Sequence, residues 1–213
     1  MTEMYYPVFL NLQDRRCLVA GGGRVALRKA NTLLEYGAEV TVISPRLCAG
    51  LRKLSSDGRI KVINRAYRTG DLKGVHIAIV ATSNRGINLA AAGEAKKRRV
   101  PVNVVDDPVL SDFIVPSIIR RGSLAIAVST SGKSPALARK IRSRLEDEFG
   151  QEYASLVLVI EKARRQAKKQ GLKISSTNWQ EAIDLDFMIA LIRKGRGEEA
   201  GKALLDRLRK CGK

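Results

Sequence analysis

Three consecutive glycines follow a short apolar run: Gly21, Gly22 and Gly23. The spacing Gly21-x-Gly23-x-x-Ala26 is typical of a turn that binds a dinucleotide. Gly21 permits the tight turn, Gly23 lets backbone approach a pyrophosphate, and Ala26 keeps the helix close to the strand. The N–H groups of the helix start, from Arg24 and Val25 onward, would bind phosphate oxygens. A glycine-rich turn can also be a structural turn that binds no ligand, but a strand before it and a helix after it favour a nucleotide site.

The position after the second predicted strand usually carries a carboxylate that binds the ribose hydroxyls of NAD. This sequence has Ser44, Pro45 and Arg46 there instead. Ribose binding would then depend on Ser44, on backbone groups or on Arg46, and the arginine would alternatively receive the 2′-phosphate of NADP. These residues alone leave the choice between NAD and NADP open.

Polar residues also follow the fourth and fifth predicted strands, Thr82 and Ser83 after one and Asp106 after the other. Ligands of an open parallel sheet bind at the carboxyl ends of its strands, near the switch in strand order. We therefore expect Thr82 and Ser83 to face the nucleotide and Asp106 to face a substrate, where a carboxylate would accept a proton while a hydride leaves. Alternatively, the Asp-Asp-Pro sequence that begins at Asp106 is a simple turn.

Histidine and cysteine are too sparse for several other chemistries. The single histidine, His76, lies at the start of a predicted buried strand, where a structural role is favoured and no Ser-His-Asp triad can form around it. No His/Cys cluster has the spacing of a zinc site, so no metal ligands are predicted. The three cysteines, Cys17, Cys48 and Cys211, are far apart and odd in number, which indicates no disulfide framework and a reducing, cytoplasmic location.

The elements that position these residues alternate between strands and helices. Short apolar runs predict strands at 17–20, 39–43, 60–63, 76–81 and 102–105, and helical spacing predicts helices at 25–36, 47–57 and 88–99. This alternation indicates right-handed crossovers and a parallel sheet covered on both faces, which is a Rossmann-type α/β domain over residues 1–112. Residues 6–12 are expected to form an edge strand or a segment packed beside the first strand.

The pattern changes in residues 113–150, which are predicted to form a small α+β insert. Two strands, at 113–119 and 124–128, are joined by a turn at 120–122, and Pro116 suits an edge or bulge position. A helix follows, with Ser134 as its N-cap and Pro135 at its first position. The insert is too small and too apolar to be stable alone, so we expect it to pair with a second copy about a twofold axis.

Residues 151–213 have helical spacing and are predicted to form a C-terminal helical domain. Gly171 and Gly195 are predicted to follow the ends of its first two helices. Three apolar stripes are expected to face a core: Leu156, Ile160, Ala163 and Ala167; Trp179, Ile183, Phe187 and Leu191; and Ala200, Leu204, Leu208 and Cys211.

The chain of 213 residues has a net charge of +18. This charge is spread along the chain, and the few aromatic residues are not interleaved with basic clusters, which argues against a nucleic-acid platform. The excess indicates either a solvated basic surface or a field that attracts a polyanionic ligand. No apolar run approaches the length of a membrane span. The first residues lack the basic start and the cleavage site of a secretory signal.

Taken together, several motifs resemble the precorrin-2 dehydrogenase/sirohydrochlorin ferrochelatase family of siroheme synthesis, which also supplies the N-terminal half of siroheme synthases. The motifs are Tyr6–Leu10 with the glycine segment Cys17–Ala30, then Val102–Asp106, Asp112–Ile119 and Ala127–Arg139. The resemblance is close over about residues 4 to 150 and looser over the helical tail. The last three motifs together are far more specific than the glycine turn.

The resemblance implies NAD-dependent oxidation of precorrin-2 to sirohydrochlorin by a homodimer, sometimes followed by insertion of ferrous iron. The family's catalytic aspartate falls on Asp106. The family lacks the ribose carboxylate too, which fits Ser44. Because Thr130 stands where the family has a phosphorylated serine, the resemblance does not carry that modification over.

The implied substrate is rich in carboxylates, which suits a basic chain. Lys133, Arg139 and Arg142 are candidates to bind them, although a solvated helix face explains these residues at least as well. An alternative from another class is a nucleotide-sensing regulatory module, which shares the glycine turn but needs neither Asp106 nor the insert. The sequence leaves open whether iron insertion accompanies dehydrogenation.

Overall fold

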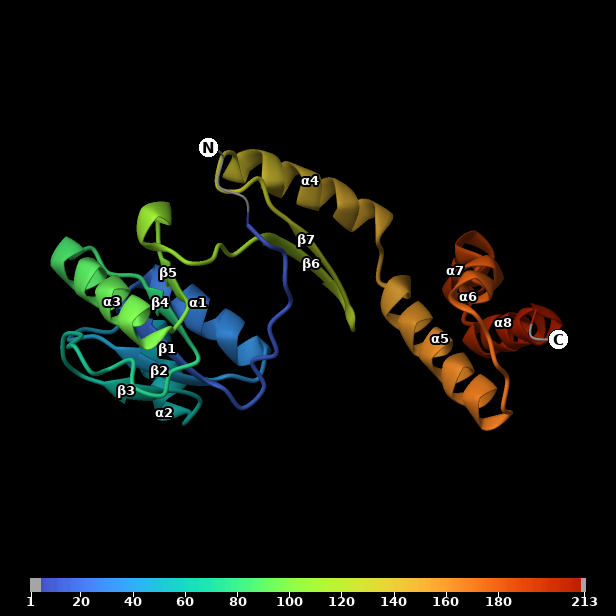
Figure 1. Ribbon diagram of the computed structural model, residues 1–213, viewed down its shortest axis with the longest axis horizontal. Coiled ribbons are helices and arrows are strands. Elements are labelled where there is room, and N and C mark those ends of the chain that lie inside the picture. The colour runs from blue at the N-terminus through green and yellow to red at the C-terminus, as the bar shows by residue number, and fades with distance from the viewer. Residues whose placement is uncertain (1–4, 212–213) are drawn as a thin grey trace. The chain divides into compact units, whose positions relative to one another are not determined.

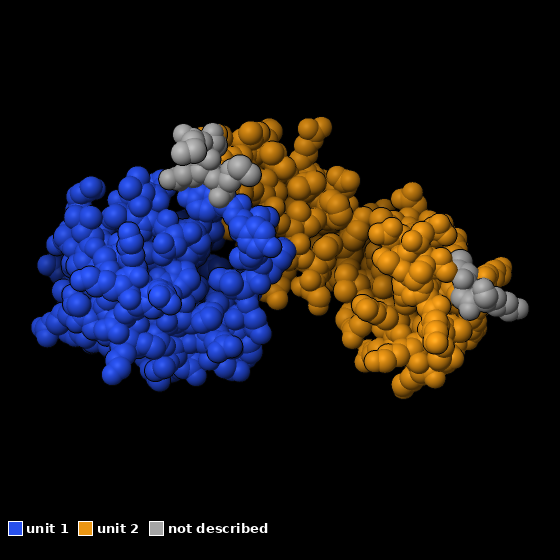
Figure 2. All heavy atoms as spheres, viewed as in Figure 1, with its two compact units in different colours: residues 1–115 blue, residues 116–213 orange. Residues whose placement is uncertain are grey.

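The computed structural model describes residues 5–211, and the chain forms two compact units, Met1–Val115 and Pro116–Lys213 (Figure 2). Within the described residues, none of the helices combines the length and the apolar character that a membrane span requires.

The first unit is built on a five-stranded parallel sheet in the order β3-β2-β1-β4-β5 (Figure 1). Each predicted strand is present within one residue of its expected ends, and each predicted helix overlaps an observed one. The Rossmann-type prediction is therefore confirmed. The elements are β1 (Arg16–Ala20), α1 (Arg24–Glu35), β2 (Glu39–Ile43), α2 (Ala49–Ser56), β3 (Lys61–Ile63), β4 (Ile77–Val80), α3 (Arg85–Arg98), β5 (Val102–Val104) and a short 3₁₀ turn η1 (Pro108–Leu110).

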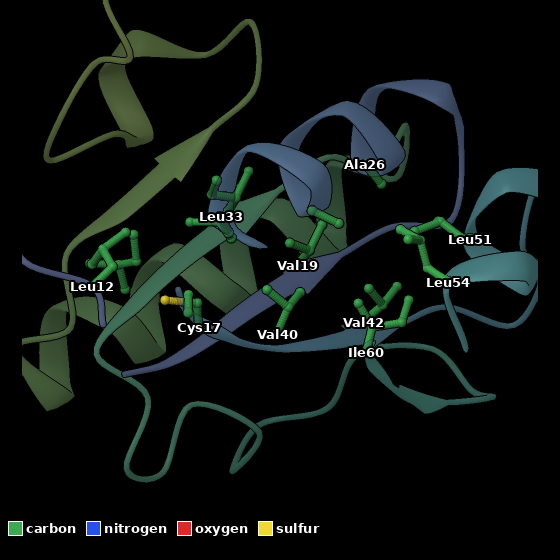
Figure 3. Packing of buried hydrophobic residues seen from close by; sticks show 14 residues of the cluster. Leu12, Cys17, Val19, Ala26, Leu33, Val40, Val42, Leu51, Leu54 and Ile60 are labelled. Atoms are coloured by element: carbon green, nitrogen blue, oxygen red, sulfur yellow. The ribbon is translucent and has the colours of Figure 1, made fainter. Parts of the chain in front are cut away.

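Alternation along the strands divides the core of this unit into two layers, because successive strand side chains point to opposite faces. One layer packs under α1 and α2, and Figure 3 shows Cys17 and Val19 of β1 in it. The other layer packs Leu18 and Ala20 of β1 against α3. With both faces covered, the central strands are apolar, β1 from Cys17 to Ala20 and β4 throughout, as a buried parallel sheet requires.

Two expectations for the first unit need correction. Of the two alternatives for residues 6–12, the strand is absent, and among these residues only Leu12 is buried, in the core cluster that contains Cys17 and Val19 of β1. A turn follows directly, in which Arg15 N–H donates to Leu12 O (3.0 Å), and β1 begins only after this turn. His76 is exposed rather than buried, because β4 begins at Ile77, which pairs with Cys17.

The second unit begins with an antiparallel pair, β6 (Ser117–Arg121) and β7 (Leu124–Val128). The connecting turn is shorter than predicted, because Arg121 still pairs with Leu124 and only Gly122 and Ser123 lie between the strands. Gly122 has φ +58°, which suits a tight hairpin turn. Pro116, which lacks a backbone donor, lies before β6 rather than within it, so the predicted first strand starts too early.

Helix α4 (Pro135–Glu148) follows, and its predicted start is confirmed. The Ser134 hydroxyl oxygen caps the helix by accepting a hydrogen bond from Leu137 N–H (3.2 Å). Pro135 occupies the first helical position, where a missing N–H costs nothing.

Four helices complete the second unit around a core of their own: α5 (Glu152–Lys169), α6 (Ser176–Ala182), α7 (Leu185–Arg193) and α8 (Gly197–Cys211). The stripe from Trp179 to Leu191 does not form one helix, because Ile183 is extended and Asp184 caps α7 by accepting a hydrogen bond from Phe187 N–H. Phe187 is 43% exposed and lies under the Arg207 guanidinium, so its predicted core position is wrong. The side chain of Cys211, predicted in the third stripe, lies outside the described residues.

A buried carboxylate fixes the loop between β3 and β4 to α3. Glu94 is 5% exposed, and its Oε2 accepts hydrogen bonds from the Tyr67 hydroxyl (2.6 Å) and from Gly70 N–H (2.8 Å). Its Oε1 accepts one from the Arg98 guanidinium. Burial disfavours the charged carboxylate, but these donors outweigh burial and hold the pKa of Glu94 below its usual range.

We predict that Glu94→Gln destabilises the first unit by about 1–3 kcal/mol at neutral pH, because an amide cannot accept from all of these donors. The depressed pKa means that the carboxylate's contribution is fully present above its ordinary value of 4.5 and is lost as pH falls through the folded-state value. The difference between wild type and variant should therefore narrow in acid. Urea unfolding at neutral and acidic pH tests this, with exposed Glu39→Gln as the control. A difference that is the same at both pH values would contradict it.

Candidate functional site

The carboxyl ends of the central strands meet at one edge of the parallel sheet (Figure 1). Hydrogen bonds continue the ladder just past these ends: Gly21 N–H donates to Ile43 O (2.9 Å), Ala81 N–H to Ala20 O (2.7 Å) and Val105 N–H to Val80 O (2.9 Å). The helices after β1 and β4 cover opposite faces, so the strand order switches between these two strands. Ligands of open α/β sheets bind at such a switch point.

The three glycines of the turn have different packing. Gly21 has φ +128°, and a Cβ added there would lie 2.3 Å from Ala81 O. A Cβ on Gly22 would lie 1.8 Å from Arg46 O, so the first two glycines are required by the fold. A Cβ on Gly23 would meet no atom within 4 Å. The first two residues of the turn are therefore packed against backbone atoms, whereas the third has free space beside it. This arrangement fits a bound pyrophosphate.

The start of α1 adds an anion-binding group to this turn. Gly23 is the N-cap and supplies no side-chain acceptor, and the first turn contains no acidic residue. The first N–H groups of the helix, with the positive end of its dipole, suit phosphate oxygens. The side chains of Arg24 and Val25 are exposed beside it.

The residues after β2 form a tight turn against the glycines. Ser44 is 7% exposed, and its hydroxyl donates to Arg46 O (2.7 Å). Cys48 N–H donates to Gly22 O (2.8 Å), which joins this turn to the glycine turn. Pro45 and Arg46 are exposed. The predicted ribose residues therefore lie next to the predicted pyrophosphate residues.

The polar residues after β4 lie on the other side of the glycine turn. Thr82 is half-buried, and its hydroxyl donates to Asn88 Oδ1 (2.7 Å), which joins the strand end to α3. Ser83 is exposed. Because Gly21 packs directly against Ala81, both residues follow a strand end that contacts the turn.

Asp106 lies in a turn at the end of β5, with φ +60° and an exposed side chain. Aspartate adopts this left-handed conformation more readily than most residues. The segment after η1 folds back along β5 and fixes the turn: Val104 N–H donates to Ser111 Oγ (2.9 Å), and Val102 N–H donates to Asp112 Oδ2 (3.0 Å). The Asn103 amide donates to Phe113 O (3.0 Å).

Lys29 was not among the residues that the sequence predicted for the site. It is half-buried on α1, one position before the buried Ala30. Burial and the neighbouring Arg28 lower the pKa of Lys29, and the Asp106 carboxylate opposes them, so Lys29 lies within electrostatic reach of Asp106. A lysine between Ala26 and Ala30 on the helix face toward the sheet was the signal that could have identified it.

The predicted substrate residues belong to the second unit. Lys133 is exposed in the loop before α4, and Arg139 is exposed on α4. Arg142 is ion-paired with Glu146 one turn along the helix. Two of the three basic side chains are thus exposed, and the third already has a carboxylate partner. Across residues 5–211, no group of three His, Cys, Asp or Glu side chains is arranged to hold a metal ion.

Two family descriptions match consecutive parts of the chain. Residues 8–117 match a putative NAD(P)-binding family, and residues 121–148 match the central part of the sirohaem biosynthesis proteins. The first match covers more than half of the chain and contains the glycine turn, the β2 end and Asp106.

Curated relatives include two siroheme synthases. That of Methylococcus capsulatus is 37% identical over 95% of this chain and 43% of its own length. That of Methylobacillus flagellatus is 42% identical over 77% of this chain and 35% of its own length. The chain therefore spans less than half the length of these relatives.

Among solved structures, SirC, a precorrin-2 dehydrogenase, superposes with a TM-score of 0.76 at 26% identity, over 97% of this chain and all of that one. These matches confirm the resemblance that the sequence motifs indicated. The chain belongs to the putative NAD(P)-binding family.

Proposed function

We propose that this protein is an NAD-dependent dehydrogenase that oxidises precorrin-2 to sirohydrochlorin in siroheme synthesis. The observation that carries the proposal is that an open glycine turn and an exposed aspartate share one sheet edge. The likeness to SirC over its whole length supports the substrate. The free, buried thiol of Cys17 fits a reducing, cytoplasmic location.

The dinucleotide site is assigned to the residues around the glycine turn. Backbone from Gly21 to Val25 holds the pyrophosphate, the β2 turn from Ser44 to Arg46 holds the adenosine ribose, and Thr82 and Ser83 border the site on the β4 side. When bound, the nicotinamide supplies a hydride acceptor.

Asp106 is assigned as the base. Oxidation removes two hydrogens from the tetrapyrrole, one as hydride and one as a proton, and the Asp106 carboxylate accepts the proton. The backbone of β5 just before its left-handed turn is bonded to Ser111 and Asp112, so the position of this turn is fixed before substrate binds.

The carboxylates of the tetrapyrrole are assigned to basic residues of the second unit. Lys133 and Arg139 are exposed, and Arg142 would exchange Glu146 for a substrate carboxylate. The net charge of +18 draws such a polyanion toward the protein.

The second unit is also assigned the dimer interface. Leu137 and Ile141 of α4 are 51% and 37% exposed and line a hollow of about 450 Å³ together with Arg144 and Asp147. A patch with apolar residues and both signs of charge is self-complementary, as a twofold interface requires.

We predict that Gly23→Ala weakens NAD⁺ binding without unfolding the protein. The added methyl group meets no protein atom within 4 Å, so the fold tolerates it, and in the proposed site it would stand where the backbone approaches the pyrophosphate. The expected loss of affinity is at least about tenfold, since the close backbone approach is removed. Calorimetric titration with NAD⁺ and thermal unfolding measure the two effects. Gly93→Ala in α3, where an added Cβ is equally free, is the matched control. Wild-type affinity in Gly23→Ala would contradict the assignment.

We predict that Asp106→Asn lowers dehydrogenation by about 10²- to 10⁴-fold, because proton transfer by a placed side chain has that effect on rate. Asparagine tolerates the left-handed turn, so the fold and NAD⁺ affinity should change little. NADH formation and sirohydrochlorin absorption from precorrin-2 provide the measurement.

Asp107→Asn is the control for this experiment, since Asp107 accepts a hydrogen bond from Leu110 N–H and caps η1. Near-normal turnover in Asp106→Asn would overturn the assignment of the base. NAD⁺ binding by wild type without turnover would support a regulatory module instead. The same preparations, supplied with ferrous iron, test iron insertion. A protein that is a dehydrogenase alone would form sirohydrochlorin but no siroheme.

We predict that wild type sediments at twice the chain mass and that Leu137→Asp shifts it to monomer. A carboxylate buried at an apolar interface without a partner strongly disfavours association. Glu148→Gln, at the end of the same helix, should leave the dimer intact. A wild-type monomer at micromolar concentration would contradict the assigned interface.

A further inference from the structure

The turn that carries Asp106 has a backbone conformation that most residues avoid. Asp107 N–H donates to Val104 O (3.1 Å), which closes a turn around Val105 and Asp106. Asp106 has φ +60°, in the left-handed region. This region is uncommon for a residue other than glycine, and a residue stays in it only where the surrounding structure holds it there. The groups that hold the turn therefore decide from which backbone position the Asp106 side chain extends.

One hydroxyl group bridges the two ends of this turn. Ser111 Oγ accepts a hydrogen bond from Val104 N–H (2.9 Å) at the start of the turn. The same hydroxyl donates to Asp107 O (2.8 Å) at the end of the turn, with Val104 O (3.1 Å) as a second acceptor. A hydroxyl has one proton and two lone pairs, so it accepts from one end and donates to the other at the same time. Ser111 thus joins the two residues between which Asp106 stands.

The position of Ser111 is itself fixed by bonds on both of its sides. Its N–H donates to Pro108 O (3.1 Å) at the end of η1. The next residue, Asp112, pairs with Val102 at the start of β5: its N–H donates to Val102 O (2.7 Å), and its carboxylate accepts from Val102 N–H (3.0 Å). Because these bonds lie outside the turn, they hold the Ser111 hydroxyl beside the turn and do not depend on the conformation of Asp106.

Part of what Ser111 does is structural. Strand β5 is at an edge of the sheet, and the bond with Val104 N–H satisfies a backbone donor at the end of that edge strand. The bond to Asp107 O goes beyond this role, because Asp107 follows the turn and lies outside β5. Its loss would release the far side of the turn, so that the Asp106 side chain would extend from a range of backbone positions.

We propose that Ser111 is a positioning residue, which holds the backbone of Asp106 in the conformation that proton transfer requires. The proposal rests on the proposed function, in which Asp106 is the base, and in it Ser111 acts only through Asp106. A displacement of about 1 Å in a catalytic group can lower the rate by about 100-fold. The bridge across the turn is therefore expected to matter for the rate as well as for the fold.

Steady-state kinetics of Ser111→Ala and Ser111→Thr with precorrin-2 and NAD⁺ test the proposal. Ser111→Ala should lower kcat about 10- to 100-fold, the range expected for a displaced catalytic group, and should leave the NAD⁺ affinity within about threefold of wild type. Ser111→Thr should retain most of the wild-type kcat, because it keeps the hydroxyl. The extended backbone of Ser111, with φ −107° and ψ 134°, suits a β-branched residue.

A second comparison separates positioning from a general loss of stability. In the Asp106→Asn background, Ser111→Ala should cause no further loss of kcat, because the effects of residues that act as a unit are not additive. Glu94→Gln is the matched control, since it disturbs buried hydrogen bonds of the same unit and should leave kcat unchanged. Thermal unfolding verifies that each variant is folded. Hydrogen exchange of the Val104 amide should accelerate in Ser111→Ala but not in Glu94→Gln.

Three results would overturn the proposal while leaving the proposed function in place. One is wild-type kcat in Ser111→Ala. Another is the same fold loss from Ser111→Ala in the wild-type and Asp106→Asn backgrounds, since a residue that acts only through Asp106 has no effect once that base is gone. The third is a loss in Ser111→Thr as large as that in Ser111→Ala. Failure of the proposed function is a different result: wild type would not oxidise precorrin-2, which overturns both.

Discussion

The close approach of backbones at the glycine turn is the constraint on which the first unit depends. Ala81 O and Arg46 O lie where the side chains of residues 21 and 22 would be. This closeness lets β1, β2 and β4 end at one level while α1 starts directly at the sheet edge. One methyl group at either position would push a neighbouring strand end away and separate the anion-binding start of α1 from the rest of the site.

Asp106 depends on a second constraint of a different kind. Its turn is not closed by packed glycines but by polar side chains that satisfy the backbone of β5, namely Ser111, Asp112 and Asn103. Helix α1 extends between the two, because its first turn follows the glycine turn and its residue Lys29 lies within electrostatic reach of Asp106. In the proposed function, this helix relates the position of the cofactor to the position of the base.

Local sequence patterns were sufficient to predict a strand or a helix start where one physical signal dominated. The buried strands are short apolar runs between turn residues, and Ser134 with Pro135 specified the start of α4. Two of the errors concern apolar residues that were expected to pack in the core and are exposed instead. Residues 6–10 are apolar yet exposed, and Phe187 turns to Arg207 because Asp184 starts a new helix there. The spacing of apolar residues shows which face of an element is apolar, but it does not show which other residues pack against that face.

The sequence by itself determined the α/β fold, the glycine turn, the absence of a ribose carboxylate and the position of Asp106 after a strand. Each of these follows from residue types at fixed spacing, which specifies local backbone conformation. Only the tertiary structure decided that Gly23 is open while Gly22 is closed, and that Lys29 lies within electrostatic reach of Asp106. These properties depend on which groups meet across the fold, because a side chain's partners come from residues distant in the sequence.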